Sequence, residues 1–353
     1  MNEEPTAPVL HDPSRHDFAS DNWAGAHPRV MAALAAANGG HQPGYGEDAY
    51  TARLRETVRR HFGPDAEPYP VFNGTGANLV ALQAMAARWQ SVICPDSAHL
   101  HTDETAAPEH AGLKLLTVPA PDGKLTPEAL RRYTRDLGNM HHAQPGVVSV
   151  SQTTELGTCY TPQELKALAA EAHAHGLRLH LDGARLANAA ATLGVPLARL
   201  TTEAGVDVVS FGATKNGALY GDCVIVLDPD AVSGLAYVKK ATTQLPSKAR
   251  FVSAQLLALL DDELWLENAR HSNAMATLLA DGLSTVPGVR LAHPVESNAV
   301  FAVLPDELAQ RLRRRYAFST WDPDRGLVRL MTAFDTTRQD VERFVEAARD
   351  LAG

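Results

Sequence analysis

The chain has 353 residues, of which 45% are hydrophobic and 21% are charged, and its formal net charge at pH 7 is −9. A chain of this length can bury a large core and commonly divides into a main domain and a smaller one. Its ordinary composition excludes disordered and fibrous classes, and its negative charge argues against binding to nucleic acid or anionic membranes, which need clustered Lys and Arg.

The cysteines and the opening segment indicate a reducing, aqueous environment. Cys94, Cys159 and Cys223 are widely spaced and form no CxxC pair, so neither a disulfide framework nor a structural zinc site is expected. The first residues are acidic, and no apolar stretch approaches the ~18 residues of a membrane span. We therefore expect a cytoplasmic protein that begins with a loose arm over residues 1–15.

Short β-branched runs alternate with Ala- and Leu-rich helical segments up to about Asp261. Such alternation is typical of an α/β fold in which helices cover a mostly parallel sheet. The runs that we interpret as strands are residues 91–94, 114–118, 147–150, 177–182, 206–211 and 224–227.

One helix of this domain is clearly delimited. Thr161-Pro-Gln-Glu164 offers an N-cap, a proline at the first helical position and a capping-box glutamate, and Gly176 allows a left-handed exit. The strand that follows then delivers Asp182 at its carboxyl end, which is where ligands bind in open α/β sheets.

After Asp261 the pattern changes to a long helix over 265–283, a short strand over 299–303, a helix, a strand over 328–331 and a final helix to 351. This order predicts a smaller α+β domain at the C-terminus. We therefore expect a large domain over 16–264, in which segment 16–45 contributes to the active site, and a small domain over 265–353.

Asp182 and Lys215 are the residues that best indicate the chemistry. Lys215 lies in Ser-Phe-Gly-Ala-Thr-Lys-Asn-Gly and Asp182 in His-Leu-Asp-Gly-Ala-Arg, and each segment closes an apolar run. A lysine that forms a Schiff base and a carboxylate that keeps a pyridinium nitrogen protonated are the two groups that pyridoxal phosphate (PLP) chemistry requires. Either residue alone would be interpreted as a surface lysine or a helix cap, but the pair predicts a PLP-binding enzyme.

Gly74-Thr75-Gly76 opens a predicted helix that runs to about residue 89. Backbone amides and the Thr75 hydroxyl can bind a phosphate there, at the positive end of the helix dipole. A dinucleotide-binding loop is the alternative, but a leucine replaces its third glycine and no strong strand precedes it.

The chain contains 15 histidines. Imidazole has an unperturbed pKa near neutrality, which suits a catalytic base, and His99 and His141 are the candidates. The pattern His99-Leu-His101-Thr-Asp103 could also be half of a metal site, but no complementary pair has ligand spacing. We expect no metal.

These motifs resemble those of the L-threonine aldolase family, within the fold-type I PLP enzymes related to aspartate aminotransferase. The resemblance covers residues 18–351. It implies a mostly parallel, seven-stranded sheet sandwiched by helices. The segments that carry it are Asp-Phe-Ala-Ser-Asp at 17–21, Tyr-Gly-Glu-Asp at 45–48, Gly-Thr-Gly at 74–76, Ala-His-Leu-His-Thr-Asp-Glu at 98–104, the Asp182 and Lys215 segments, and Val-Arg-Leu-Met-Thr at 328–332.

The resemblance also implies cofactor-binding roles. Lys215 would form the Schiff base and Asp182 would pair with the pyridine nitrogen, while His99 would stack on the ring. Arg185 would lie beside the cofactor. The phosphate would be held by the start of the helix and by basic residues of this or a neighbouring subunit, namely Gly74, Thr75, Gly76, Lys248 and Arg250.

Substrate-binding roles follow from the same resemblance. Arg185 and Arg329 would bind the carboxylate of an amino acid, a task that suits a planar bidentate guanidinium. Ser20 and Tyr45 would reach the same pocket.

The function implied is that of a low-specificity L-threonine aldolase, a lyase that cleaves the Cα–Cβ bond of β-hydroxy-α-amino acids. L-threonine and L-allo-threonine would give glycine and acetaldehyde, and β-aryl serines are further candidate substrates. The alternatives are β-elimination, transamination or transaldolase chemistry on the same cofactor, or a regulatory protein that kept the fold. A homodimer or homotetramer with a shared active site is expected, and the β-hydroxyl base is left open between His99, His141 and water.

Overall fold

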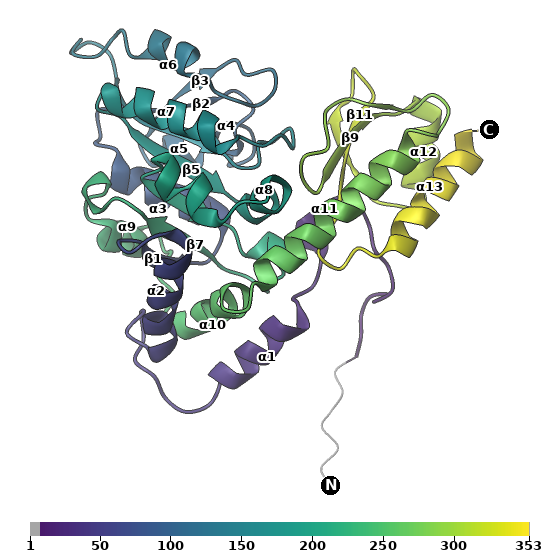
Figure 1. Ribbon diagram of the computed structural model, residues 1–353, viewed down its shortest axis with the longest axis horizontal. Helices are drawn as coiled ribbons and strands as arrows, with labels where there is room; N and C mark the ends of the chain where they lie inside the picture. Colours follow the sequence, from purple (N-terminus) through teal and green to yellow (C-terminus); the bar gives the residue numbers. More distant parts are fainter. Residues whose placement is uncertain (1–7, 353) are drawn as a thin grey trace.

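A seven-stranded sheet forms the centre of the larger lobe in the computed structural model, which describes residues 8–352 (Figure 1). The strand order is β1-β7-β6-β5-β4-β2-β3, and β7 runs in the direction opposite to the other six strands. The prediction of a mostly parallel sheet is therefore confirmed. The strands are β1 (Glu67–Val71), β2 (Gln90–Pro95), β3 (Lys114–Val118), β4 (Gln144–Ser151), β5 (Arg178–Gly183), β6 (Val208–Phe211) and β7 (Asp222–Val226).

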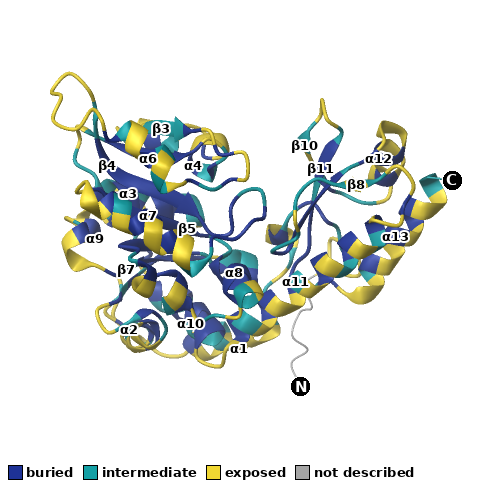
Figure 2. Ribbon diagram, turned by 45° about the horizontal axis from the view of Figure 1, so that its top comes forward, coloured by how far each residue is buried: buried dark blue, intermediate teal, exposed yellow. Residues whose placement is uncertain are grey.

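Helices cover both faces of this sheet, and they turn buried sides inward and exposed sides outward (Figure 2). Strands covered in this way read as continuous apolar runs, and every residue of β6 and β7 is buried. The helices of this lobe are α1 (Pro28–Ala37), α2 (Ala49–Phe62), α3 (Gly74–Met85), α4 (His99–Thr102), α5 (Ala107–His110), α6 (Pro127–Tyr133), α7 (Pro162–Ala174), α8 (Leu186–Leu193), α9 (Leu235–Ala241) and α10 (Ala249–Leu260).

The start of α7 has the capping box that the sequence predicts. The Thr161 side chain accepts a hydrogen bond from the Glu164 amide, and the Glu164 carboxylate accepts one from the Thr161 amide at 2.7 Å. Gly176 then takes a positive φ of 71°, a conformation that glycine adopts without steric cost. The chain can therefore turn directly into β5.

Strand β1 is a difference from the sequence analysis, which expected no strong strand before the Gly74 helix. Its sequence Glu-Pro-Tyr-Pro-Val contains two prolines, which cannot donate to a ladder and are tolerated at a sheet edge. β1 is an edge strand that pairs with β7. It ends at Val71, just before α3, and α3 ends at Met85 rather than near residue 89.

The long helix α11 (Leu264–Leu283) leads to a smaller lobe with an antiparallel sheet in the order β10-β11-β9-β8 (Figure 1). The long helix and the two longer strands agree with the sequence prediction. The two shorter strands were not predicted. The elements of this lobe are β8 (Arg290–Leu291), β9 (Ala299–Val303), α12 (Asp306–Arg313), β10 (Ser319–Asp322), β11 (Leu327–Met331) and α13 (Arg338–Ala352).

The segment around Phe18 packs on this smaller lobe. The Phe18 amide donates to the Ala317 carbonyl, the Met331 amide donates to the Phe18 carbonyl, and the Phe18 ring lies edge-on to Phe344 with centroids 4.9 Å apart. The short helix η1 (Asp21–Trp23) then contacts the larger lobe near Lys215. This segment therefore joins both lobes.

Residues 8–15 of the predicted arm are exposed, and residues 1–7 lie outside the described part of the chain. Among the helices of residues 8–352, none is both long and apolar enough to cross a membrane.

Candidate active site

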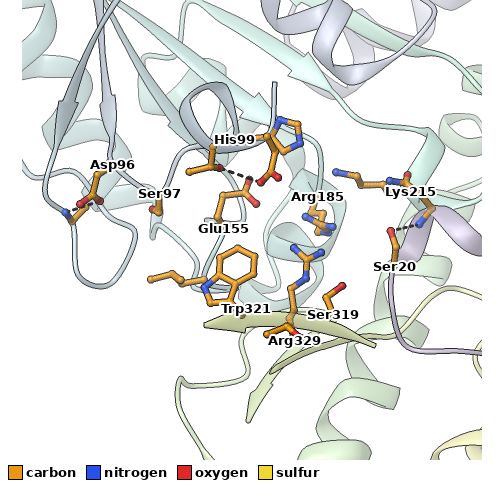
Figure 3. A pocket seen from close by; sticks show the side chains of 16 residues that line it. Ser20, Asp96, Ser97, His99, Glu155, Arg185, Lys215, Ser319, Trp321 and Arg329 are labelled. Carbon is orange, nitrogen blue, oxygen red and sulfur yellow. Dashed lines mark hydrogen bonds between the residues drawn. The ribbon is translucent and has the colours of Figure 1, made fainter. Parts of the chain in front are cut away.

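Two adjoining cavities lie where the parallel strands end. The inner cavity, of about 340 Å³, is bounded by the start of α3 and by the ends of β5 and β6. The outer cavity, of about 920 Å³, extends to Ser319, Trp321 and Arg329 of the smaller lobe (Figure 3). Both cavities are lined by Asn22, His99, Glu155 and Lys215.

Lys215 lies on η4 (Thr214–Asn216), the short turn after β6. The Asp222 carboxylate shapes this turn, because it accepts hydrogen bonds from the amides of Ala213 and Thr214 at 2.7 and 3.1 Å. At Gly212 a Cβ atom would come within 2.4 Å of the Ala184 carbonyl oxygen, so only glycine fits there. The turn thus holds the half-buried Lys215 amine against both cavities.

Asp182 is connected to His99 by a buried chain of hydrogen bonds. The Asn78 side-chain amide donates to Asp182 Oδ2 and to Glu104 Oε1, at 2.9 Å in each case. Glu104 Oε1 also lies 2.9 Å from His99 Nδ1, and its side chain is fully buried. This hydrogen bond is the main reason why the pKa of His99 is raised above its ordinary value.

The guanidinium of Arg185 is committed to Asp21. Arg185 Nε and Nη2 donate to the two Asp21 oxygens at 2.7 and 3.0 Å, and Asn298 donates to the same carboxylate at 3.0 Å. Burial acts to raise the pKa of Asp21, but the charge and hydrogen bonds of Arg185 outweigh it and lower the pKa to about 2. The three side chains join the N-terminal segment, the larger lobe and the smaller lobe.

Arg329 is the less committed cation of the outer cavity. Its Nε is buried and has no hydrogen-bond partner within residues 8–352. Its guanidinium lies over the Trp321 ring, 5.1 Å from the centroid. Burial and the nearby charge of Arg185 lower the pKa of Arg329, and a bound anion would relieve both effects.

The start of α3 borders the inner cavity with Gly74 and Thr75. Asn73 caps this helix, because its side-chain oxygen accepts the Gly76 amide at 2.7 Å. Gly76 itself faces Gln244, whose side chain lies 2.2 Å from the position of a Cβ atom. Two of the three predicted phosphate-loop residues therefore line the cavity, and the third packs behind it.

Besides Gly74 and Thr75, the structure brings Ser20, His99, Asp182, Arg185, Lys215 and Arg329 to these cavities. Besides Gly76, it leaves four predicted residues outside them. His141 is exposed on the loop between α6 and β4, so within one chain its position does not support a role as base. Tyr45 is 57% exposed and its ring lies beside the Lys240 ammonium. Lys248 is exposed before α10, and Arg250 donates to the Gly40 carbonyl.

Four residues that sequence reasoning did not select belong to the site, namely Asp21, Asn78, Glu104 and Glu155. Asn78 and Glu104 share one buried network although they lie 26 positions apart in the chain. Glu155 carried a usable signal, because it follows the predicted strand 147–150 as closely as His99 follows the strand 91–94.

Comparison with known proteins gives concordant results. Residues 17–307 match the model of the beta-eliminating lyase family. A low-specificity L-threonine aldolase of Pseudomonas aeruginosa is 44% identical over 95% of this chain and 96% of its own length. That of Saccharomyces cerevisiae is 30% identical over 86% of this chain and 79% of its own.

The solved structures show the same relationship. The threonine aldolase of Leishmania major superposes with a TM-score of 0.91 at 33% identity, and the match covers 96% of this chain and all of that one. The aspartate aminotransferase of Thermus thermophilus superposes with a TM-score of 0.69 at 21% identity, which shows a common fold alone.

Proposed function

Since the chain belongs to the beta-eliminating lyase family, and within it to the threonine aldolases, we propose that it is a PLP-dependent, low-specificity L-threonine aldolase. Its substrates are β-hydroxy-α-amino acids such as L-threonine and L-allo-threonine, and its products are glycine and an aldehyde. The observation that carries this proposal is the placement of Lys215 in the wall shared by the two cavities, with Asp182 lining the inner one and Arg329 the outer one.

The residues of the inner cavity fit PLP. Lys215 offers an amine, Asp182 offers a carboxylate for a protonated ring nitrogen, and the start of α3 offers amides and the Thr75 hydroxyl for a phosphate. Asn78 Oδ1 is a buried acceptor beside Asp182 and has no hydrogen-bond partner in the described part of the chain, which is a further sign that this wall is shaped for a polar ligand. When bound, PLP supplies an electron sink for the pair released at Cα.

Asp182 is held ready for this task by its neighbours. The Asn78 amide and the Ala184 backbone amide donate to its two oxygens, at 2.9 and 3.1 Å. These two hydrogen bonds fix the orientation of the Asp182 carboxylate, which can then pair with a positive ring nitrogen. His99 contacts Glu104 and lines the same cavity, which supports the proposal that its ring stacks on the cofactor.

Arg329 is the proposed anchor of the substrate carboxylate. Its Nε, which has no partner within residues 8–352, and its guanidinium plane over Trp321 suit a bidentate hydrogen bond to a carboxylate. Arg185 assists mainly through its charge, because two of its nitrogens already donate to Asp21. Fixing the carboxylate on one side limits how the Cα substituents face the inner cavity, and orientation of this kind contributes strongly to rate.

We also propose a homo-oligomer whose neighbouring subunit completes the phosphate site. The support is that the described cavity wall contains Gly74 and Thr75 but neither Lys248 nor Arg250. Chemical cross-linking and light scattering on the PLP-bound protein test this proposal, and an active monomer at assay concentration would contradict it.

The activity is tested by product analysis. Purified protein supplied with PLP is incubated with L-threonine or L-allo-threonine, and acetaldehyde, glycine and 2-oxobutyrate are quantified together. We expect acetaldehyde and glycine in equal amounts, with none formed by Lys215→Ala. Formation of 2-oxobutyrate alone would instead support β-elimination, and no turnover of any β-hydroxy amino acid by the PLP-loaded protein would refute the proposal.

A further inference from the structure

Cleavage of a β-hydroxy amino acid requires a group that accepts the proton of the β-hydroxyl. The structure separates the two predicted histidines, because only His99 lines the cavities. His141 is exposed and lines neither cavity. Nδ1 of His99 lies 2.9 Å from the buried Glu104 carboxylate, so one ring nitrogen is already engaged, and the proposed role of this ring is to contact the cofactor.

Glu155 is a carboxylate at the junction of the two cavities. It lies on the loop between β4 and α7 and lines both the inner and the outer cavity. Figure 3 shows its side chain in the space between His99 and the guanidinium groups of Arg185 and Arg329. Within residues 8–352 its side chain makes no ion pair within 4.0 Å, and no hydrogen bond holds it in place.

The electrostatics agree with this placement. Burial and closer partners have larger effects on the pKa values of His99, Arg185 and Arg329, but the charge of Glu155 acts to raise all three. A single carboxylate influences three groups in this way only when it is close to all of them. Glu155 therefore lies between His99, beside the proposed cofactor site, and the two arginines that would hold the substrate carboxylate.

Other carboxylates of the site are either engaged or too far out. Asp182 accepts two hydrogen bonds, and Glu104 is buried against Asn78 and His99. Asp96 and Asp103 line the outer cavity only, where they accept hydrogen bonds from the Ala120 amide and from the Thr102 hydroxyl. Glu155 combines access to both cavities with an uncommitted carboxylate.

Resting on the proposed aldolase function, we propose that Glu155 is the catalytic base for the β-hydroxyl proton. Its carboxylate accepts the proton, the O–H electron pair becomes the second bond of the aldehyde C=O, and the Cα–Cβ bond breaks. The pair from that bond stays on Cα, which then takes up one proton to give glycine. The proton gained by Glu155 returns to solvent through the outer cavity, so substrate and products balance without any other reagent.

The test compares two reactions of the PLP-loaded enzyme. Threonine cleavage needs the β-hydroxyl proton to be removed, whereas exchange of the glycine α-proton with D₂O uses the cofactor and carboxylate sites without a β-hydroxyl. Glu155→Gln keeps the size of the side chain but removes the base. We expect kcat for threonine cleavage to fall about 10²–10⁴-fold, the usual contribution of a general base, while glycine exchange stays within about threefold, a difference of less than 1 kcal/mol.

Controls separate a base from a structural residue. Glu203→Gln makes the same chemical change at an exposed position remote from both cavities and should leave both rates unchanged. Glu155→Asp keeps a carboxylate and should recover part of the cleavage rate. If the glutamine variant does not fold, the aspartate variant replaces it in the comparison of cleavage with glycine exchange.

The assignment would be overturned if Glu155→Gln cleaved threonine at the wild-type rate, or if this variant lost cleavage and glycine exchange to the same extent. An aspartate variant no faster than the glutamine variant would also count against it. The proposed function is judged separately, because it depends on whether the wild-type enzyme cleaves threonine at all, whereas this inference depends on the ratio between variant and wild type.

Discussion

The ion pair between Asp21 and Arg185 should be a large contributor to the stability of the two-lobed structure. Its side chains are only 1% and 11% exposed, and Asn298 of the smaller lobe donates to the same carboxylate. Asp21→Asn leaves the Arg185 charge buried without its partner, and breaking a buried pair in this way costs about 3–5 kcal/mol.

The lowered pKa of Asp21 gives a second measure of the same interaction. A fall from 3.8 to about 2 corresponds to about 2–3 kcal/mol of stability at neutral pH, at roughly 1.4 kcal/mol per unit. Because the folded-state pKa is the lower one, this stability is fully present above the unfolded-state pKa and is lost as the pH falls toward about 2. The difference between wild type and Asp21→Asn should therefore shrink in acid.

Urea unfolding of wild type and Asp21→Asn at pH 7 and at pH 3 measures both effects. Glu203→Gln is the matched control, because the Arg199–Glu203 pair is also in close contact, at 2.9 Å, but both side chains are 49% exposed. A pair of this kind contributes only about 0.2–1 kcal/mol. A cost for Asp21→Asn no greater than for Glu203→Gln, or a cost that does not change with pH, would refute the reasoning.

Three further predictions concern the cavities. Borohydride reduction should fix PLP on the peptide that contains Lys215, as seen by mass spectrometry, whereas Lys215→Ala should gain no label; a labelled alanine variant would show that another lysine reacts. Arg329→Ala should raise KM for threonine about 10–100-fold, which corresponds to losing a hydrogen bond between charged groups. Arg329→Lys should have an intermediate KM, and unchanged kinetics in the alanine variant would remove Arg329 from the substrate site. His141→Ala should keep kcat/KM within about twofold, as for other surface changes, whereas His99→Ala should slow cleavage, and a matching loss in both would bring His141 back as a candidate.

The regular elements of the larger lobe were predictable because local signals and tertiary context agree there. The strands with β-branched runs and the capped helix α7 appear close to their expected bounds. β1 was missed because its two prolines lower strand propensity, and only its place at the sheet edge makes them acceptable. The strand β8 has only two residues, too few for any period to be recognised.

The long-range pairs of the site could not be inferred from one sequence. Asp21 and Arg185 are 164 positions apart, and neither residue type identifies the other as its partner. Asn78 and Glu104 likewise look like ordinary helix and loop residues until the fold brings them against Asp182 and His99. Such contacts depend on how elements pack, and side-chain identity alone does not determine packing.

The topology nevertheless contains a rule that would have found Glu155. His99, Glu155 and Lys215 each lie four positions beyond the last residue of a parallel strand, after β2, β4 and β6 respectively, and Asp182 lies at the end of β5. These four strands are neighbours in the sheet, so their carboxyl ends must place the following residues around one space. A search for polar residues shortly after each predicted strand selects Glu155 on the same grounds as His99. A search for histidines instead selects His141, which lies on the loop before β4 and therefore at the amino ends of the parallel strands, away from the site. The position of a residue just after the carboxyl end of a parallel strand was thus a better guide to the site than the ordinary pKa of its side chain.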